Sequence, residues 1–458
     1  MSVASTAPPA LKAVGITRVL KNLGILLGGR AVNAPLSLIH ISLAMHMLGS
    51  YGFGLIAMMY AFARMMGDVV DFQSWQVVLH YGLRPLTHND RNGFQKIVSF
   101  SLFLDGISGA LGCGLGIAIS MFGMNALGWP TSIHHIGTIY CISILFMTTA
   151  TPMGLLRLFD RYDLIAMQGT IATIVRLIGT ASLFFVGASV SRLAGIWMLA
   201  EAAAWTILFG CAILEMRKRR LLQGFAHRFC ATVPDILTNR FGRDHQGIWR
   251  FAWATNFNST LSLTFGHIGT LIVGSLLGPA SAGYYRIASQ VAAGIAKPVT
   301  LVQSTLYPEM ARMWREQSTK RLYRMCVQIA LVGGALGSLL LVVAFFAGRP
   351  LLDFMTGDAH SRALPVMLWL LAAEIVTVWG LPLEPLLFTT RKSGAAILAR
   401  TMETIFFLPF LVLMIRWYGL GGVGPATLCA TLILIGIQLV IVIASRHETA
   451  ADQDAATC

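Results

Sequence analysis

Long hydrophobic runs, each about the length of a membrane span, recur along the chain from residue 20 to residue 445. A helix needs roughly 20 apolar residues to cross the hydrocarbon core of a bilayer, whereas a membrane β-strand needs only about ten. The pattern therefore predicts an all-α integral membrane protein. It predicts twelve transmembrane helices, at residues 20–46, 53–83, 94–121, 133–157, 164–188, 192–214, 249–277, 282–311, 322–347, 363–389, 393–416 and 422–445.

The longest polar stretch separates the predicted helices into two sets of six. We expect an N-terminal six-helix bundle at residues 1–214, a basic cytoplasmic linker at 215–248, a C-terminal six-helix bundle at 249–445 and a cytoplasmic tail at 446–458. No remaining polar region is large enough for a separate soluble domain.

A short motif recurs in the two predicted bundles. Leu48-Gly49 followed by Gly54-Leu55 matches Leu277-Gly278 followed by Gly283-Tyr284, at an offset of 229 residues. Each copy marks the predicted outer turn between the first two helices of its bundle. We interpret this as an internal duplication, although Leu-Gly turns could also recur by chance. With six helices in each half, the two copies would enter the membrane in the same direction.

The composition and the charge pattern agree with a multi-pass membrane protein. Hydrophobic residues make up 56% of the chain and charged residues 12%, against about 25% charged in a soluble domain. If both termini are cytoplasmic, 24 of the 34 Lys and Arg lie in cytoplasmic segments, four in outer loops and six within helices. Cytoplasmic loops of membrane proteins are enriched in these residues. The net charge of +14 is then a topology signal, and it does not indicate nucleic-acid binding.

Basic residues inside the predicted helices are the main functional signal. Arg30, Arg64, Arg176 and Lys297 interrupt otherwise apolar segments. A cation at the centre of a bilayer costs about 2.5–3.5 kcal/mol on insertion scales, so it must face a wet cavity or a partner charge. A transporter with a cationic interior would move an anion. The alternative for Arg64 is a structural ion pair with Asp68, four residues further along the helix.

Polar stripes follow one face of several predicted helices, because residues three, four and seven apart share a face. The first helix carries Arg30, Asn33 and Ser37; the second carries Tyr60, Arg64, Asp68, Asp71 and Trp75; the eighth carries Arg286, Gln290 and Lys297. We expect these faces to line a central cleft and the cations, Asn33 and Tyr60 to bind substrate. Arg286 lies near a helix end, where its side chain could instead reach lipid headgroups.

The acidic residues Asp68, Asp71 and Glu374 lie farthest from the ends of their predicted helices. We expect them to be the sites for a coupling ion, either H⁺ or Na⁺, unless they only neutralise buried arginines. The seven cysteines are scattered without a CxxC pair, and the chain has no GxSxG, HExxH or P-loop motif. We therefore predict no bound metal, no organic cofactor and no enzymatic activity.

The outer-turn motifs resemble those of a known family. Residues 47–54 (MLGSYGFG), 277–286 (LGPASAGYYR) and 306–312 (LYPEMAR) are similar to segments of Wzx-type polysaccharide transporters. That family belongs to a superfamily that includes multidrug and toxin extrusion (MATE) proteins and lipid II flippases. The resemblance implies a MATE-like, V-shaped pair of bundles with alternating access. It also implies a location in the bacterial inner membrane.

The implied cargo is an oligosaccharide repeat unit on undecaprenyl diphosphate, with membrane lipids and other polysaccharide assembly proteins as further partners. Two other functions remain open. A drug or cation antiporter on the same scaffold would prefer an acidic, aromatic cavity. A membrane enzyme such as a polysaccharide polymerase would need larger outer loops than those predicted here.

Overall fold

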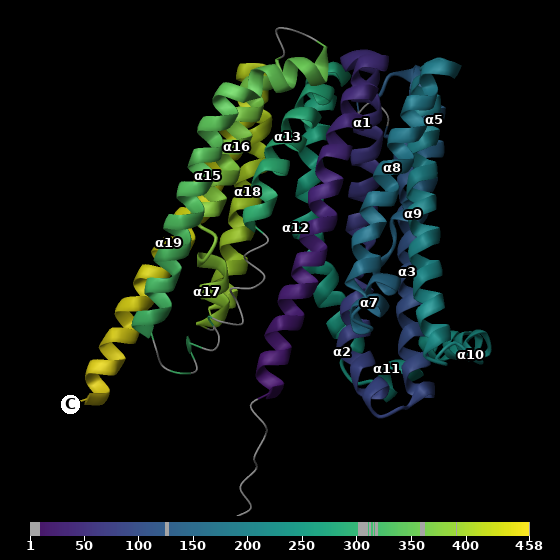
Figure 1. Ribbon diagram of the computed structural model, residues 1–458, viewed down its shortest axis with the longest axis vertical. Coiled ribbons are helices and arrows are strands. Elements are labelled where there is room, and N and C mark those ends of the chain that lie inside the picture. The colour runs from purple at the N-terminus through teal and green to yellow at the C-terminus, as the bar shows by residue number, and fades with distance from the viewer. Residues whose placement is uncertain are drawn as a thin grey trace, which may run out of the picture. The chain divides into compact units, whose positions relative to one another are not determined.

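The computed structural model describes residues 10–123, 128–300, 310, 313–314, 316, 319–357, 362–390 and 392–457, and the regular elements among them are all helical. The side chains of Arg30 and Lys297 lie outside the described residues. The chain divides into two compact units (Figure 1): unit 1 comprises Met1–Leu48 and Leu55–Leu271, and unit 2 comprises Gly49–Gly54 and Ile272–Cys458. The predicted division into bundles at residues 215–248 stays a prediction.

Unit 1 contains most of the long first helix and the helices that follow it in sequence. Its elements are α1 (Ala10–Val70), α2 (Ser74–Thr87), α3 (Arg91–Phe122), η1 (Thr131–Ile133), α5 (His134–Tyr140), η2 (Cys141–Ser143), α6 (Ile144–Met147), α7 (Ala150–Leu158), α8 (Tyr162–Val186), α9 (Val190–Lys218), α10 (Phe225–Leu237), α11 (Arg240–Asp244) and α12 (Ile248–Leu277) up to Leu271.

Unit 2 contains the remaining helices. They are α13 (Pro279–Thr300), α15 (Thr319–Thr356), α16 (Ala363–Trp379), α17 (Leu383–Thr389), α18 (Ser393–Tyr418), η3 (Gly419–Gly422) and α19 (Val423–Thr457). Within this unit α16 packs against α13, α15 and α19, and α18 packs against α19.

Helical segments long and apolar enough to cross a membrane confirm the predicted all-α membrane fold. Eight such segments occur among the described residues. Two of them, Val32–Thr87 and Gly394–Ala444, are 56 and 51 residues long, and each therefore has the length of two crossings. The outer surface of the helices is also apolar: Phe122 and Phe185 are 90% and 93% exposed. Such a surface suits lipid rather than water.

Three of the predicted helices are interrupted, and the prediction of one continuous helix is wrong at residues 53–83 and 133–157. Residues 71–73 separate α1 from α2, with Gln73 at a φ of 49°. A second break, at Thr148 and Thr149, precedes α7, and a third lies at residues 380–382 and ends in Pro382. Proline lacks the N–H that a continuing helix requires.

The two copies of the Leu-Gly motif have matching backbone geometry. Gly49 breaks α1 at a φ of 67°, and Gly278 separates α12 from α13 at a φ of 84°. Both values lie in the left-handed region that glycine tolerates. The second glycines of the motifs also meet within unit 2: a Cβ at Gly54 would lie 1.7 Å from the Pro279 carbonyl oxygen, and one at Gly283 would lie 2.6 Å from the Ser50 carbonyl oxygen.

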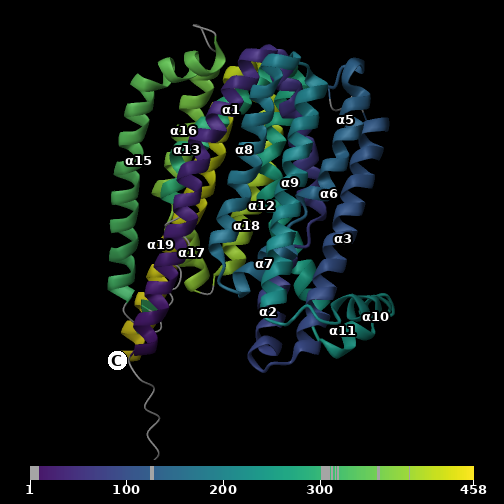
Figure 2. The ribbon, with the colours of Figure 1, turned by 45° about the vertical axis from the view of Figure 1, so that its right-hand side comes forward.

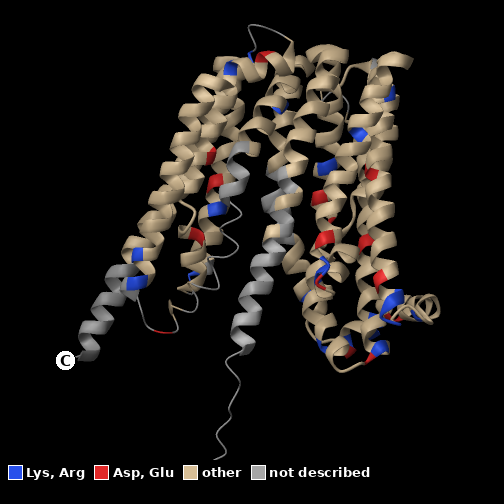
Figure 3. Ribbon diagram, in the orientation of Figure 1, with Lys and Arg blue, Asp and Glu red and all other residues tan. Residues whose placement is uncertain are grey.

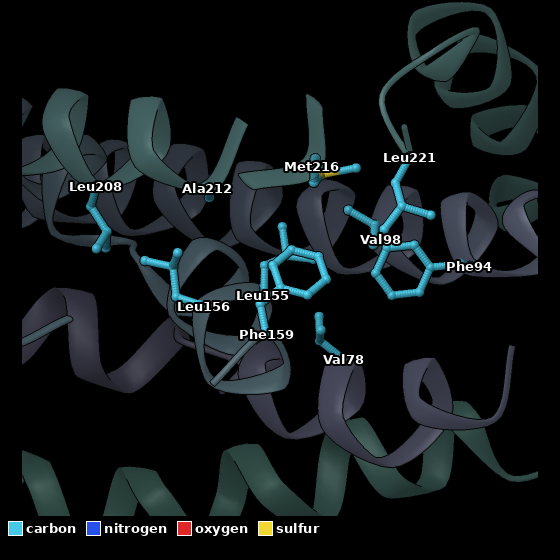
Figure 4. Packing of buried hydrophobic residues seen from close by; sticks show 10 residues of the cluster. All are labelled: Val78, Phe94, Val98, Leu155, Leu156, Phe159, Leu208, Ala212, Met216 and Leu221. Atoms are coloured by element: carbon cyan, nitrogen blue, oxygen red, sulfur yellow. The ribbon is translucent and has the colours of Figure 1, made fainter. Parts of the chain in front are cut away.

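A hydrophobic cluster joins α2, α3, α7 and α9 within unit 1 (Figure 4). Its buried members are Val78, Phe94, Val98, Leu155, Leu156, Phe159, Leu208, Ala212, Met216 and Leu221. Burial of a Leu or Phe side chain contributes about 1.5–3 kcal/mol in water. In lipid, close packing replaces much of that driving force.

The buried carboxylate of Asp105 fixes the same helices by hydrogen bonds. It accepts from the Ser74 hydroxyl at the start of α2, and its Oδ2 accepts from the Thr151 backbone N–H at 2.8 Å, in the first turn of α7. The Ser74 and Thr151 hydroxyl oxygens lie 3.1 Å apart. The carboxylate therefore satisfies an N–H that a helix start leaves without a partner inside the helix.

The segment predicted as a basic linker is folded onto unit 1. Figures 1 and 2 show α10 and α11 lying across the end of α3, and α10 packs against α3. The anchor is Phe241, which is 2% exposed and stacks on Phe100 with ring centroids 4.9 Å apart. Charged residues gather at this end of unit 1 (Figure 3).

Candidate functional site

A polar and aromatic cluster lies inside unit 1, where α1, α8, α9 and α12 supply its side chains. We call it the polar cluster; its members are Tyr60, Arg64, Asp68, Arg176, Trp197, Glu201 and His267. It brings together four of the residues that the sequence predicted for substrate or ion binding, namely Tyr60, Arg64, Asp68 and Arg176.

Arg176 on α8 is held by an acid from the neighbouring helix. Its guanidinium forms an ion pair with the Glu201 carboxylate on α9, and the two side chains are 12% and 13% exposed. The guanidinium also lies 4.8 Å from the ring centroid of Trp197 and 5.1 Å from that of Tyr60. The sequence offers no acid three or four residues from Arg176, and its partner comes instead from another helix.

Arg64 has a much looser contact. Its Nη2 lies 3.9 Å from the Asp68 Oδ1, and its side chain is 32% exposed while that of Asp68 is 10% exposed. The other carboxylate oxygen, Asp68 Oδ2, lies 3.7 Å from Nε2 of His267 on α12. The alternative pairing of Arg64 with Asp68 is therefore present only as a long contact. Arg64 is more accessible to a ligand than Arg176.

Asp71 lies in the break after α1 and not on the helical stripe predicted for it. Its carboxylate accepts from the Gln73 backbone N–H at 3.0 Å and from Gln73 Nε2 at 2.7 Å. Its carbonyl oxygen accepts from Asn256 Nδ2 on α12 at 2.8 Å. The Gln73 Oε1 in turn accepts from Trp75 Nε1 at 2.8 Å. Asp71 thus orders the break and orients Trp75.

Two further predicted site residues, Arg286 and Glu374, belong to unit 2. Arg286 on α13 and Glu374 on α16 both act electrostatically on the Tyr285 hydroxyl. Arg400 on α18 contacts two acids: Glu384 at 3.1 Å and Glu403 at 3.8 Å. Among the described residues, no three His, Cys, Asp or Glu side chains are grouped as metal ligands would be.

A cavity of about 480 Å³ opens within unit 1 and includes Asn33, another predicted site residue. Its lining comprises Gly29, Asn33, Trp75, Leu79, Met153, Arg157, Tyr162, Ile165, Ala166 and Gly169. The Arg157 guanidinium stacks 4.1 Å from the centroid of the Trp75 ring. Arg157 was not among the predicted site residues, because it lies at the end of the predicted span 133–157, where a basic residue is expected as a topology signal.

The helix arrangement matches that of known transporters over nearly the whole chain. A multidrug resistance MATE family transporter of the MOP superfamily, in an inward-facing conformation, matches with a TM-score of 0.71 at 11% identity, covering 93% of this chain and 99% of that one. The lipid II flippase MurJ, in an inward closed conformation, matches with a TM-score of 0.67 at 14% identity, covering 91% and 87%. The chain therefore has the fold of the MOP superfamily.

The sequence itself defines the family. Residues 19–314 match the polysaccharide biosynthesis protein family, and the chain belongs to that family. The inner membrane protein YghQ of Escherichia coli (strain K12) is 29% identical over 345 residues, which cover 75% of this chain and 94% of that protein. The predicted family is confirmed, and the structural matches show the predicted MATE-like fold.

Proposed function

We propose that the protein is a flippase that carries an undecaprenyl-diphosphate-linked oligosaccharide repeat unit across the inner membrane for polysaccharide biosynthesis. The observation that carries the proposal is the polar cluster, which places two arginines inside membrane-spanning helices of a chain from a polysaccharide biosynthesis family. A diphosphate leaves water only for charge-assisted contacts, and sugar hydroxyls find partners among Tyr and Trp side chains.

The proposed architecture is twelve helices in two six-helix bundles related by an internal duplication, with both termini cytoplasmic. Support for the duplication comes from Gly49 and Gly278, which lie 229 positions apart and share a positive φ. Support for the orientation comes from the basic residues around α10 and α11 at one end of unit 1. In this orientation, an inside-negative potential favours export of an anion by about 2.3 kcal/mol per charge per 100 mV.

In the proposed mechanism, Arg64 contacts the diphosphate and Asp68 exchanges a coupling ion. The two side chains touch only at 3.9 Å, so an anionic ligand competes effectively with Asp68 for the guanidinium. Release of Arg64 leaves the Asp68 carboxylate facing His267, and this change makes the carboxylate available to H⁺ or Na⁺. Asp71 and Glu374 remain proposed coupling residues, and Arg30, Lys297 and Arg286 remain proposed substrate contacts.

One observation favours a multidrug or cation antiporter as the second candidate. In the polar cluster, Arg64 contacts Asp68 and Arg176 forms an ion pair with Glu201. The rings of Tyr60 and Trp197 also lie against Arg176, so the cluster contains the acidic and aromatic groups that such an antiporter would use. The two functions differ in what accumulates when the gene is deleted. A flippase predicts undecaprenyl-linked repeat units on the cytoplasmic face and loss of surface polymer, whereas an antiporter predicts normal polymer and increased drug sensitivity.

The decisive cellular test is deletion followed by complementation. Wild-type protein and the exposed-residue control Arg84→Ala should restore the polymer, while Arg64→Ala should leave the lipid-linked repeat unit in the cytoplasmic leaflet. Normal polymer in the deletion strain would contradict the proposed function.

A further inference from the structure

The cavity in unit 1 lies beside the connection between α7 and α8, outside the polar cluster. Its walls come from α1, α2, α7 and α8. Glycine keeps α1 and α8 close at this point: a Cβ at Gly29 would lie 2.8 Å from the Ala166 Cβ. A volume of about 480 Å³ is within the range of small-ligand pockets.

Arg157 is positioned as an anion ligand by a chain of contacts. Its guanidinium stacks on the face of Trp75 at 4.1 Å, and the Trp75 indole N–H is fixed by Gln73, which is fixed by Asp71. Its Nη2 also lies 3.7 Å from Met153 Sδ, a weak acceptor in the wall of the same cavity. A guanidinium carries five N–H donors in one plane, and this fork matches the oxygens of a phosphate group.

Asn33 supplies a hydrogen-bond acceptor in the same cavity. Its Oδ1 is buried and has no hydrogen-bond partner among the described residues. A buried oxygen without a donor costs about 1–3 kcal/mol. A ligand hydroxyl that donates to it would recover this energy. The cavity therefore offers a cation for an anionic group and an acceptor for a hydroxyl group.

We propose that this cavity is a loading site that binds the phosphate-linked first sugar of a lipid-linked saccharide. Its phosphate lies against Arg157, and a sugar hydroxyl donates to Asn33 Oδ1. This inference rests on the proposed flippase function and specifies a site for its substrate. Tyr162, Gly169 and Arg176 follow at intervals of seven residues on α8 and so share one face. That face leads from the cavity to the polar cluster.

The test measures binding of three probes to full-length protein in nanodiscs: undecaprenyl-diphosphate-N-acetylglucosamine, undecaprenyl diphosphate and inorganic pyrophosphate. Arg157→Gln should weaken binding of the sugar-bearing lipid about 10- to 100-fold, because it removes a charge-assisted contact. Arg157→Lys should weaken it less. The control Arg84→Gln, an exposed arginine on α2, should bind like wild type.

A second pair of variants changes only the space in the cavity. A Cβ at Gly169 would lie 3.6 Å from Asn33 Nδ2, an ordinary contact, so Gly169→Ala should weaken binding less than Gly169→Leu does. The larger side chain of Gly169→Leu should fill the cavity and weaken binding about tenfold or more. Asn33→Ala should weaken the sugar-bearing lipid about threefold to tenfold and leave undecaprenyl diphosphate unchanged.

The outcomes separate this site from the proposed function. Wild-type affinity in Arg157→Gln and Gly169→Leu would overturn the loading site while leaving flipping intact. Pyrophosphate that binds as tightly as the lipids would overturn the assignment to a lipid-linked ligand. Normal export of polymer in the deletion strain would instead contradict the flippase function, on which the loading site depends.

Discussion

Replacing Glu201 with glutamine tests whether the buried ion pair in unit 1 is a structural element. The substitution keeps the shape of the side chain but leaves the Arg176 guanidinium, which is 12% exposed, without its carboxylate. The aromatic contacts at 4.8 and 5.1 Å are present before and after the change, so they do not offset the loss.

The expected cost follows from the burial of both partners. Removing one partner of a buried ion pair destabilises a protein by about 3–5 kcal/mol, because an uncompensated charge remains. Both side chains of this pair retain slight exposure, so we expect a value near the lower end, about 3 kcal/mol. The double variant Arg176→Met with Glu201→Leu removes both charges and should recover most of this loss, because apolar replacement of a whole pair is often neutral.

The assay is thermal unfolding of purified protein in detergent, followed by the loss of the monodisperse peak in size-exclusion chromatography. Unfolding of a large membrane protein is expected to be irreversible, so midpoints rank the variants at one heating rate. Glu201→Gln should unfold several degrees below wild type, and the double variant should lie between them or match wild type. A Glu201→Gln midpoint equal to that of wild type would refute the reasoning.

Three further predictions concern other contacts. Asp105→Ala should lower the free energy of unfolding by about 2–4 kcal/mol, because it removes the acceptor that Ser74 and Thr151 use. Asp105→Asn keeps an acceptor oxygen and should cost less. Equal melting midpoints for the two variants would contradict this. Gly283→Ala should destabilise the protein by about 1–3 kcal/mol, because its Cβ would lie 2.6 Å from the Ser50 carbonyl oxygen. The control Gly294→Ala, on the same helix, should be tolerated because its Cβ would meet nothing within 4 Å. Arg64→Ala should change the melting midpoint little, because the 3.9 Å contact between Arg64 and Asp68 is long and partly exposed. The same variant should abolish complementation. A large fall in the midpoint would instead indicate a structural role for Arg64.

Local patterns predicted the helices and their outer turns because these depend on residues close together in the sequence. Apolar length predicted an all-α membrane fold, for which the described residues provide eight candidate spans, and the paired motifs correctly placed turns at Gly49 and Gly278. The break at residues 71–73 was not predictable in this way, because the sequence Asp-Phe-Gln contains neither glycine nor proline. It forms because Asp71 bonds locally to Gln73 and its carbonyl bonds to Asn256 on another helix.

The candidate site was predicted only in part, since it depends on which helix faces meet. Tyr60, Arg64 and Asp68 share one helix, so their common face could be derived from spacing. Glu201 lies 25 residues from Arg176, and only the packing of α8 on α9 makes it the partner. The pairing of Arg157 with Trp75 across α7 and α2 likewise required the fold.

We propose that the charged residues inside unit 1 carry a lipid-linked anionic saccharide across the membrane. The most direct measurement is flipping of a fluorescent undecaprenyl-diphosphate-saccharide in proteoliposomes, scored by the fraction that an external quencher reaches. We predict that wild-type protein and Arg84→Ala move the lipid, and that Arg64→Ala, with an unchanged melting midpoint, slows it about tenfold or more. Equal rates for wild-type and Arg64→Ala protein, or no flipping above protein-free vesicles, would contradict the account.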